Sequence, residues 1–169
     1  MQESEIKFGT DGWRGVISDD FTFENVRRVA QAIASYYNSG LQTQNSKLKI
    51  AVGYDTRFLS DRYAQIVSEV LSQNKIDVIL SDRSTPTPML SFTVRNKKLT
   101  AGVMITASHN PGEYNGIKIK TQTGGAAGVE VTKEIERLIR QTQRHKDTKT
   151  QRKIKKTDLT KDYIKFLRS

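Results

Sequence analysis

The chain has 169 residues, 36% of them hydrophobic and none cysteine, so it can bury a core as one domain but cannot form disulfides or thiolate metal sites. No apolar run approaches the roughly 20 residues of a membrane helix, and the first six residues lack the apolar stretch of a secretory signal, so we expect a cytoplasmic protein. The net charge is +10, but residues 133–169 hold 13 of the 28 basic side chains and 5 of the 18 acidic ones, so the excess is local.

Helix and strand patterns alternate along the chain. Apolar residues at helical spacing predict one helix that Thr22 can cap and Gly40 can end, and a second helix that begins at Ser60. Thr85-Pro-Thr-Pro88 turns the chain and can open a short helix, because proline is tolerated in a first turn. Short apolar runs predict strands at 48–52, 76–80 and 101–105. This alternation predicts a three-layer α/β/α domain with a mixed, mostly parallel sheet.

The segment 115–121 predicts a strand with two different faces. Ile117 and Ile119 alternate with Lys118 and Lys120, so one face is apolar and the other is cationic. Only nine residues separate this segment from the strand before it, whereas a parallel crossover needs a dozen or more. We therefore expect this strand to run antiparallel to its predecessor, which makes the sheet mixed.

The last part of the chain predicts two more amphipathic helices, at 131–139 and 158–168. Residues 146–157 contain a single aliphatic side chain, Ile154, and are expected to be a linker. We therefore predict an α/β/α domain at 1–145 that bears the candidate site. The remaining residues, 146–169, are expected to be a basic linker and a helix that lead to a second domain absent from this chain.

The basic run 144–156 contains no aromatic side chain, whereas nucleic-acid modules combine basic and stacking groups on one folded face. This composition favours a solvated linker over a polyanion contact. A non-catalytic phosphate- or polyanion-binding module that uses this basic segment is the alternative function. Neither nucleic acid nor a membrane is the partner that we expect.

Ser108 follows the predicted strand at 101–105, and strand ends in open α/β sheets are where ligands bind. A serine there can be a nucleophile, a phosphate carrier or an ordinary turn residue, and the residue types alone favour the turn. The hydrolase interpretation needs a Gly-x-Ser-x-Gly elbow, and neither glycine is present. His109 is a poor base for its neighbour because successive side chains diverge in an extended segment, and His145 lies in the basic tail.

Residues 8–15 form a glycine-rich tract that contains Thr10 and Arg14. Glycines let a backbone approach an anion closely, and successive N–H groups can form an anion-binding nest. The guanidinium fork of Arg14 matches a phosphate group. The tract matches neither Gly-x-Gly-x-x-Gly nor the P-loop, so a plain glycine-rich turn is the default interpretation.

Lys118 and Lys120 share the cationic face of their strand, and one of them can reach back over the serine loop. A lysine beside a phosphate and a sugar hydroxyl can neutralise charge and move protons, whereas two solvated lysines are the alternative. Asp55 and Arg57 follow another strand and are expected to pair and shape a loop. Asp19-Asp20 is interpreted as a loop and helix-capping feature, and no metal site can be completed from the sequence.

Three tracts in this order resemble the α-D-phosphohexomutases, the phosphoglucomutase/phosphomannomutase superfamily. They are Phe8-Gly-Thr-Asp-Gly-Trp-Arg-Gly15, Thr106-Ala-Ser-His-Asn-Pro111 and Asn115-Gly-Ile-Lys118. Gly53-Tyr-Asp-Thr-Arg57 and Thr85-Pro-Thr-Pro88 also stand in the expected order. The hexapeptide around Ser108 is highly specific. The resemblance covers essentially the whole chain but only the first of the family's four domains.

The resemblance implies that Ser108 carries a phosphoryl group, gives it to a hexose phosphate and regains one from the bisphosphate intermediate, so that 1-phospho and 6-phospho sugars interconvert. Thr10 and Arg14 would bind phosphate, and His109 and Lys118 would stabilise charge and serve proton transfer at the sugar hydroxyl. A phosphoserine oxygen would be one ligand of the family's Mg²⁺, and a hexose 1,6-bisphosphate would be the activator. The implied partners are a phosphosugar and the missing C-terminal domains.

The chain also departs from the family pattern. It lacks the metal-binding Asp-Gly-Asp-x-Asp-Arg loop, the sugar-selecting Gly-Glu-x-Ser-Gly-His tract and the C-terminal phosphate-binding loop. We therefore expect a fragment without mutase turnover. Trp13 favours the phosphoglucomutase/phosphomannomutase branch over the phosphoglucosamine branch, and the choice between glucose and mannose stays open.

Overall fold

The structure, a computed structural model, describes residues 5–9, 12–39, 47–141 and 152–169. Its elements are β1 (Trp13–Val16), α1 (Phe23–Asn38), β2 (Lys49–Tyr54), α2 (Ser60–Gln73), β3 (Asp77–Ser81), α3 (Thr87–Asn96), β4 (Ala101–Ile105), β5 (Tyr114–Thr121), α4 (Val129–Gln141), β6 (Ile154–Thr157) and α5 (Thr160–Leu167). The strands form one sheet in the order β1-β5-β4-β2-β3-β6. β2, β3, β4 and β6 pair in parallel, and β5 runs antiparallel to both β4 and β1. The predicted mixed, mostly parallel sheet is confirmed.

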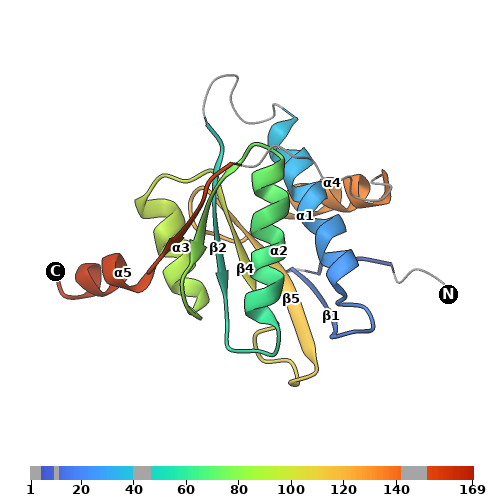
Figure 1. Ribbon diagram of the computed structural model, residues 1–169, viewed down its shortest axis with the longest axis horizontal. Coiled ribbons are helices and arrows are strands. Elements are labelled where there is room, and N and C mark those ends of the chain that lie inside the picture. Colours follow the sequence, from blue (N-terminus) through green and yellow to red (C-terminus); the bar gives the residue numbers. More distant parts are fainter. Residues whose placement is uncertain (1–4, 10–11, 40–46, 142–151) are drawn as a thin grey trace.

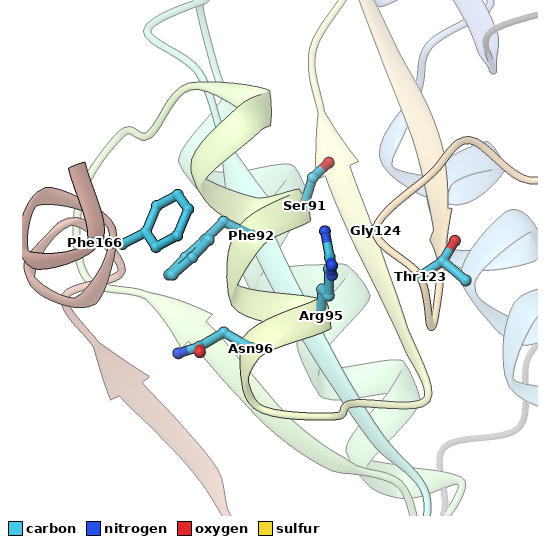
Figure 2. A pocket seen from close by; sticks show the side chains of 7 residues that line it. All are labelled: Ser91, Phe92, Arg95, Asn96, Thr123, Gly124 and Phe166. Atoms are coloured by element: carbon cyan, nitrogen blue, oxygen red, sulfur yellow. The ribbon is translucent and has the colours of Figure 1, made fainter. Parts of the chain in front are cut away.

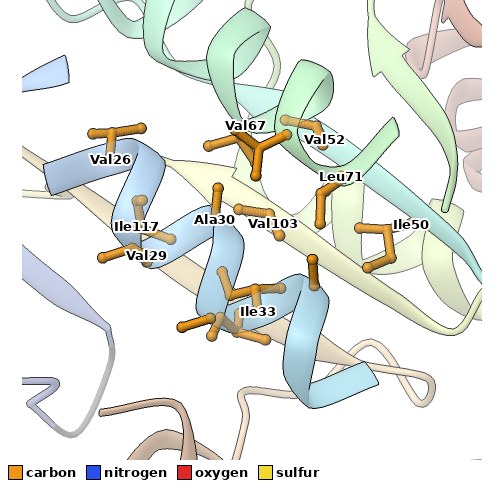
Figure 3. Packing of buried hydrophobic residues seen from close by; sticks show 14 of the residues in the cluster. Val26, Val29, Ala30, Ile33, Ile50, Val52, Val67, Leu71, Val103 and Ile117 are labelled. Atoms are coloured by element: carbon orange, nitrogen blue, oxygen red, sulfur yellow. The ribbon is translucent and has the colours of Figure 1, made fainter. Parts of the chain in front are cut away.

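Helices cover both faces of this sheet (Figure 1). α1, α2 and α4 lie on one face, and the apolar side chains of α1 point at the sheet residues Val103 and Ile117 (Figure 3). α3 covers the other face, where Leu90 and Val94 pack with Met104 in a smaller apolar cluster. The predicted three-layer α/β/α architecture is therefore confirmed.

The first helix forms where its sequence pattern predicts it. Thr22 Oγ1 accepts a hydrogen bond from Asn25 N at 3.1 Å, which satisfies one of the free N–H groups at the helix start. Residues of α1 at helical spacing are fully buried, among them Val26, Val29 and Ile33. Burying such side chains stabilises a fold by about 1.5–3 kcal/mol each. The predicted stop at Gly40 lies outside the residues that the structure describes.

The glycine-rich tract does more than turn. Residues 13–16 form β1, which pairs with β5 at the edge of the sheet, so the default turn interpretation is wrong there. Trp13 is 3% exposed and stacks on Phe21 with 4.7 Å between ring centroids. The four residues of β1 are too few for a periodic pattern, and β5 supplies their hydrogen-bonding partners from a hundred residues away.

The predicted linker is also wrong at its end, because residues 154–157 form β6 beside β3, with Ile154 opposite Val78. A strand at a sheet edge needs few apolar side chains, and exposed lysines such as Lys155 and Lys156 are common on such edges. Residues 142–151 of the predicted linker lie outside the described part of the chain. The second domain to which this segment is expected to lead stays a prediction.

Candidate functional site

The loops that follow β2 and β4 meet at the carboxyl edge of the parallel strands, at the bottom of Figure 1. This is the edge at which open α/β sheets bind their ligands. The loop after β4, residues 106–113, carries Ser108 and is called the serine loop below. Short local contacts shape it: Thr106 Oγ1 accepts from Ser108 N at 3.0 Å, and Ala107 O accepts from Asn110 N at 3.1 Å.

Ser108 is exposed at the surface of this loop and has a left-handed backbone with φ of 55°. A residue with a side chain rarely adopts this conformation, because it brings Cβ close to the backbone. Such strain persists only where neighbouring contacts hold it, and it concentrates at functional sites. Other residues that are not glycine, such as Ser18 and Lys98, also have a positive φ. The conformation is thus compatible with a turn, and the role of Ser108 as a phosphate carrier stays a prediction.

Lys118 is the basic residue that reaches the serine. Its Nζ donates a hydrogen bond to Ser108 Oγ at 2.7 Å, and the whole residue is only 7% exposed. In β5, Lys118 lies opposite Met104 near the end of β4, whereas Lys120 lies opposite Gly102, further from the loop. The strand pattern left two lysines as candidates and the family resemblance named Lys118, which is the lysine that lies beside Ser108.

Arg14 reaches the serine loop from β1. It lies opposite Gly116 on β5, and its Nη1 donates to Asn110 Oδ1 at 2.5 Å. Gly116 makes this approach possible, since a Cβ at that position would lie 2.6 Å from Trp13 O and 2.7 Å from Thr106 O. Two segments almost a hundred residues apart, β1 and the serine loop, thus meet at this site.

The glycine tract lies against the same lysine. Gly12 has a φ of +103°, and a Cβ on it would lie 2.4 Å from Ile117 O and 3.1 Å from Lys118 Cγ. Glycine is thus required by both conformation and space. Thr10, the tract's other candidate phosphate ligand, lies outside the described residues.

Sequence reasoning placed Asp55 and Arg57 together, and the structure confirms the pair, with 3.5 Å between Arg57 Nε and Asp55 Oδ2. What it did not predict is the loop that Arg57 shapes. The guanidinium donates to backbone carbonyls of the serine loop, including Ser108 O at 2.9 Å. A signal that could have found this contact is an Asp-x-Arg pair directly after a parallel strand, beside another loop at the same sheet edge.

The chain is similar to known proteins in both sequence and fold. The family model described as "Phosphoglucomutase/phosphomannomutase, alpha/beta/alpha domain I" matches residues 5–146. The chain belongs to this family. It is similar to the phosphoglucomutase of Staphylococcus aureus strain MRSA252, with 42% identity over 143 residues, and to that of strain USA300, with 41%. These matches cover 81% of the chain and 25% of each relative, so the chain spans about a quarter of the length of these relatives.

Solved structures show the same fold for this phosphoglucomutase/phosphomannomutase domain. A Thermus thermophilus protein assigned as a phosphomannomutase superposes with a TM-score of 0.84 and 36% identity. That match covers 98% of the chain and 36% of the other protein. Parafusin from Paramecium, a phosphoglucomutase in an open form, has a TM-score of 0.81 over 96% of the chain and 34% of its own, and at 22% identity it supports the fold alone.

The remaining candidates of this family domain are less constrained. His109 is exposed beside Ser108, and His145 lies outside the described residues. No helix among the described residues is both long and apolar enough to span a membrane. Of the basic run 144–156, residues 152, 153, 155 and 156 are exposed along the outer strand β6, and the polyanion-binding alternative stays a prediction.

The Mg²⁺ implied by the family resemblance does not find a protein ligand set in the described part of the chain. There, no group of three or more His, Asp or Glu side chains lies close enough together to hold a metal ion. Asp55 Oδ1 already accepts from Arg57 N and Ser60 Oγ. Asp19 and Asp20 lie in the turn before α1, which Thr22 caps in their place.

The domain also has a hollow of about 580 Å³ away from the serine loop, between α3, α5 and the turn after β5. The rings of Phe92 and Phe166 pack together along one side of the hollow, with 5.0 Å between their centroids (Figure 2). Arg95 also lines the hollow. None of the residues that line this hollow is a site candidate.

Proposed function

We propose that this chain is the phosphoserine-bearing first domain of a sugar phosphomutase. The enzyme would interconvert hexose 1-phosphates and hexose 6-phosphates, of glucose and/or mannose, through a bisphosphate intermediate. The observation that carries the proposal is the 2.7 Å hydrogen bond from Lys118 Nζ to Ser108 Oγ at the carboxyl edge of the sheet. The names of the curated relatives, which are phosphoglucomutases, support the reaction class.

Two phosphoryl transfers make up the reaction. In the first, a sugar hydroxyl oxygen forms a bond to the phosphorus on Ser108 while the bond from phosphorus to Oγ breaks. The hydroxyl proton passes to a neighbouring base, and Oγ leaves with a developing negative charge. Lys118 Nζ is within hydrogen-bonding distance of Oγ, so it can stabilise that charge or protonate the leaving oxygen. The second transfer reverses these steps with the other phosphoryl group of the reoriented bisphosphate.

Arg14 and His109 complete the charged surroundings in this proposal. Arg14 reaches the serine loop through Asn110 and brings a guanidinium, whose fork matches phosphoryl oxygens. His109 stands at the exposed surface next to Ser108, where it can meet the sugar and share proton transfer at its hydroxyl. Catalysis of this kind consists mostly of positioning and charge neutralisation.

Two further components of the proposal come from outside the chain. Mg²⁺ would take one oxygen of the Ser108 phosphate as a ligand, and its other ligands would come from a different domain. A hexose 1,6-bisphosphate would load the serine. The phosphosugar and the other domains of the same polypeptide are thus the proposed partners.

The test is to map phosphate in the full-length polypeptide that contains this chain. After exposure to a hexose 1,6-bisphosphate, we expect one phosphoryl group on the peptide that contains Ser108, by intact mass and peptide mapping. Ser108→Ala should remove that label and the isomerisation of glucose 1-phosphate. Ser84→Ala, an exposed serine in the loop after β3, should change neither. If Ser108 stays unlabelled while the enzyme turns over, the proposal is rejected. If the isolated chain isomerises glucose 1-phosphate by itself, the expectation that it is an inactive fragment is wrong.

A further inference from the structure

The guanidinium of Arg57 lies against the serine loop and gathers its backbone. Nη1 donates to Pro111 O at 2.7 Å and to Tyr114 O at 3.0 Å. Nη2 donates to Ser108 O at 2.9 Å and to Asn110 O at 2.5 Å. One side chain from the loop after β2 thus binds four carbonyl groups between the end of β4 and the start of β5.

These bonds use the donors of Arg57. An arginine has five N–H groups, two on each Nη and one on Nε. The four Nη hydrogens point at the four carbonyls, and Nε lies 3.5 Å from Asp55 Oδ2. The side chain is only 14% exposed. Arg57 therefore cannot donate to a phosphoryl oxygen without releasing part of the loop, which excludes it from the direct phosphate ligands.

A buried network holds Arg57 in this orientation. Asp55 Oδ1 accepts from Arg57 N at 2.9 Å and from Ser60 Oγ at 2.8 Å. Ser60 Oγ in turn accepts from Asn115 Nδ2 at 2.9 Å, and both Ser60 and Asn115 are fully buried. Asn115 lies two residues after the end of the serine loop, next to Tyr114, whose carbonyl Arg57 binds, so the network links Arg57 back to the segment that it holds. Connected polar groups in a buried environment reinforce one another and specify one geometry.

We propose that Arg57 is a positioning residue for Ser108, which acts through the backbone of the serine loop. It holds Ser108 in the left-handed conformation that directs Oγ to Lys118. It also pairs the negative ends of four carbonyl dipoles with a cation, so that they do not repel a dianion on the serine. The inference rests on the proposed function in one respect, namely that Ser108 carries a phosphoryl group.

Arg57→Lys tests this inference, because it keeps the charge and removes the fork that reaches four carbonyls. Arg62→Lys, at an exposed position on α2, is the matched control. Both changes are made in the 169-residue chain. Amide hydrogen exchange followed by mass spectrometry reports on the unphosphorylated serine loop. A second preparation with phosphoserine incorporated at position 108 is titrated by ³¹P NMR, which reports on the charges around the phosphate.

We expect Arg57→Lys to speed exchange of the amides at 108–114 by at least about tenfold, with the helices unchanged. The second pKa of the phosphoserine should lie below that of free phosphoserine in the unmodified chain and rise towards it in the variant. Arg62→Lys should change neither quantity. If Arg57→Lys prevents folding, Asp55→Asn loosens the same clamp and should shift both readouts in the same direction to a smaller extent.

Results other than these would contradict either the role of Arg57 or the proposed function. Unchanged exchange overturns the clamp, and faster exchange with an unchanged ³¹P titration reduces Arg57 to a structural residue. A phosphoserine that titrates like the free amino acid in the unmodified chain, with no response to Lys118→Met, counts against the proposed function. The exchange measurement then still judges the clamp by itself, so the two failures can be told apart.

Discussion

Individual residues set the geometry of the candidate site. Ser108 has a left-handed backbone, and glycine stands where two backbone segments approach closely. Ser108 has a φ of 55°, and its Oγ accepts from the nearly buried Lys118. Gly116 lets β1 and the serine loop pack against β5 so closely that a Cβ at this position would clash with both backbones. The position of Arg14 at Asn110 depends on that approach. A change at Gly116 should therefore disturb both the site and the packing of β1 against β5.

Gly116→Ala tests the close approach. The added Cβ would lie 2.6 Å from Trp13 O and 2.7 Å from Thr106 O, and both atoms belong to backbone that cannot rotate away. We expect a loss of about 1–3 kcal/mol in the free energy of unfolding, measured by urea denaturation. Gly112→Ala, in the neighbouring serine loop, is the control, because nothing lies within 4 Å of its Cβ. Equal stability of the two variants would show that the strands are further apart than described.

At the scale of elements, β6 and α5 extend the domain beyond the matched residues 5–146. Asp158 stands between them and fixes the start of α5. Its Oδ1 accepts from Thr160 N at 2.9 Å and from Thr160 Oγ1 at 2.5 Å, and its Oδ2 lies 3.6 Å from Arg83 Nη2. The side-chain hydrogen bond from Thr160 is the largest cause that lowers the pKa of Asp158 below 3.8, followed by the backbone hydrogen bond from the same residue.

A lowered carboxyl pKa makes the contribution of Asp158 to stability depend on pH. The contribution is fully present above the unfolded value of 3.8 and is lost as the pH falls through the lower folded value. Asp158→Asn should therefore lower the urea midpoint at pH 7, and its deficit should shrink as the pH falls below 3.8. Ser84→Ala, at an exposed position without an ionisable group, is the control and should leave the urea midpoint unchanged at both pH values. A deficit that is constant with pH would remove the carboxylate from the explanation.

For the whole molecule, the two faces of the sheet carry unequal cores. The larger cluster lies under α1, α2 and α4, and the smaller one lies under α3 and includes Leu159 at the start of α5. Leu159 is 2% exposed, whereas Leu167 at the end of the same helix is 64% exposed. The last helix is thus anchored by Leu159 just before its first turn, contacts Phe92 of α3 through Phe166, and exposes Leu167 at its end.

Leu159→Ala tests whether the C-terminal segment belongs to this domain. Removal of a buried leucine side chain should cost about 2–5 kcal/mol of unfolding free energy. Leu167→Ala should change it by no more than about 0.5 kcal/mol, because its side chain is largely exposed. Both values follow from urea denaturation of the complete chain. Similar small effects would mean that residues 152–169 do not share the core.

Much of the fold could be predicted from the sequence, because it depends on local spacing. The helix capped by Thr22 and the strand at 101–105 follow from short-range patterns. The antiparallel direction of β5 follows from the nine-residue connection before it. Each of these inferences needs information from fewer than about twenty neighbouring residues. Ser108 is different, because it was singled out by a family resemblance that rests on three tracts between residues 8 and 118.

Contacts between distant segments were decided only by the tertiary structure. Strand register placed Lys118 beside Ser108, and pairing with β5 turned the glycine tract into β1. Ile154 became part of β6 because β3 offered an unpaired edge. Arg57 found its four carbonyls more than fifty residues away. The physical reason is that hydrogen bonds across a sheet edge depend on which strands become neighbours, and no periodicity within one segment records that choice.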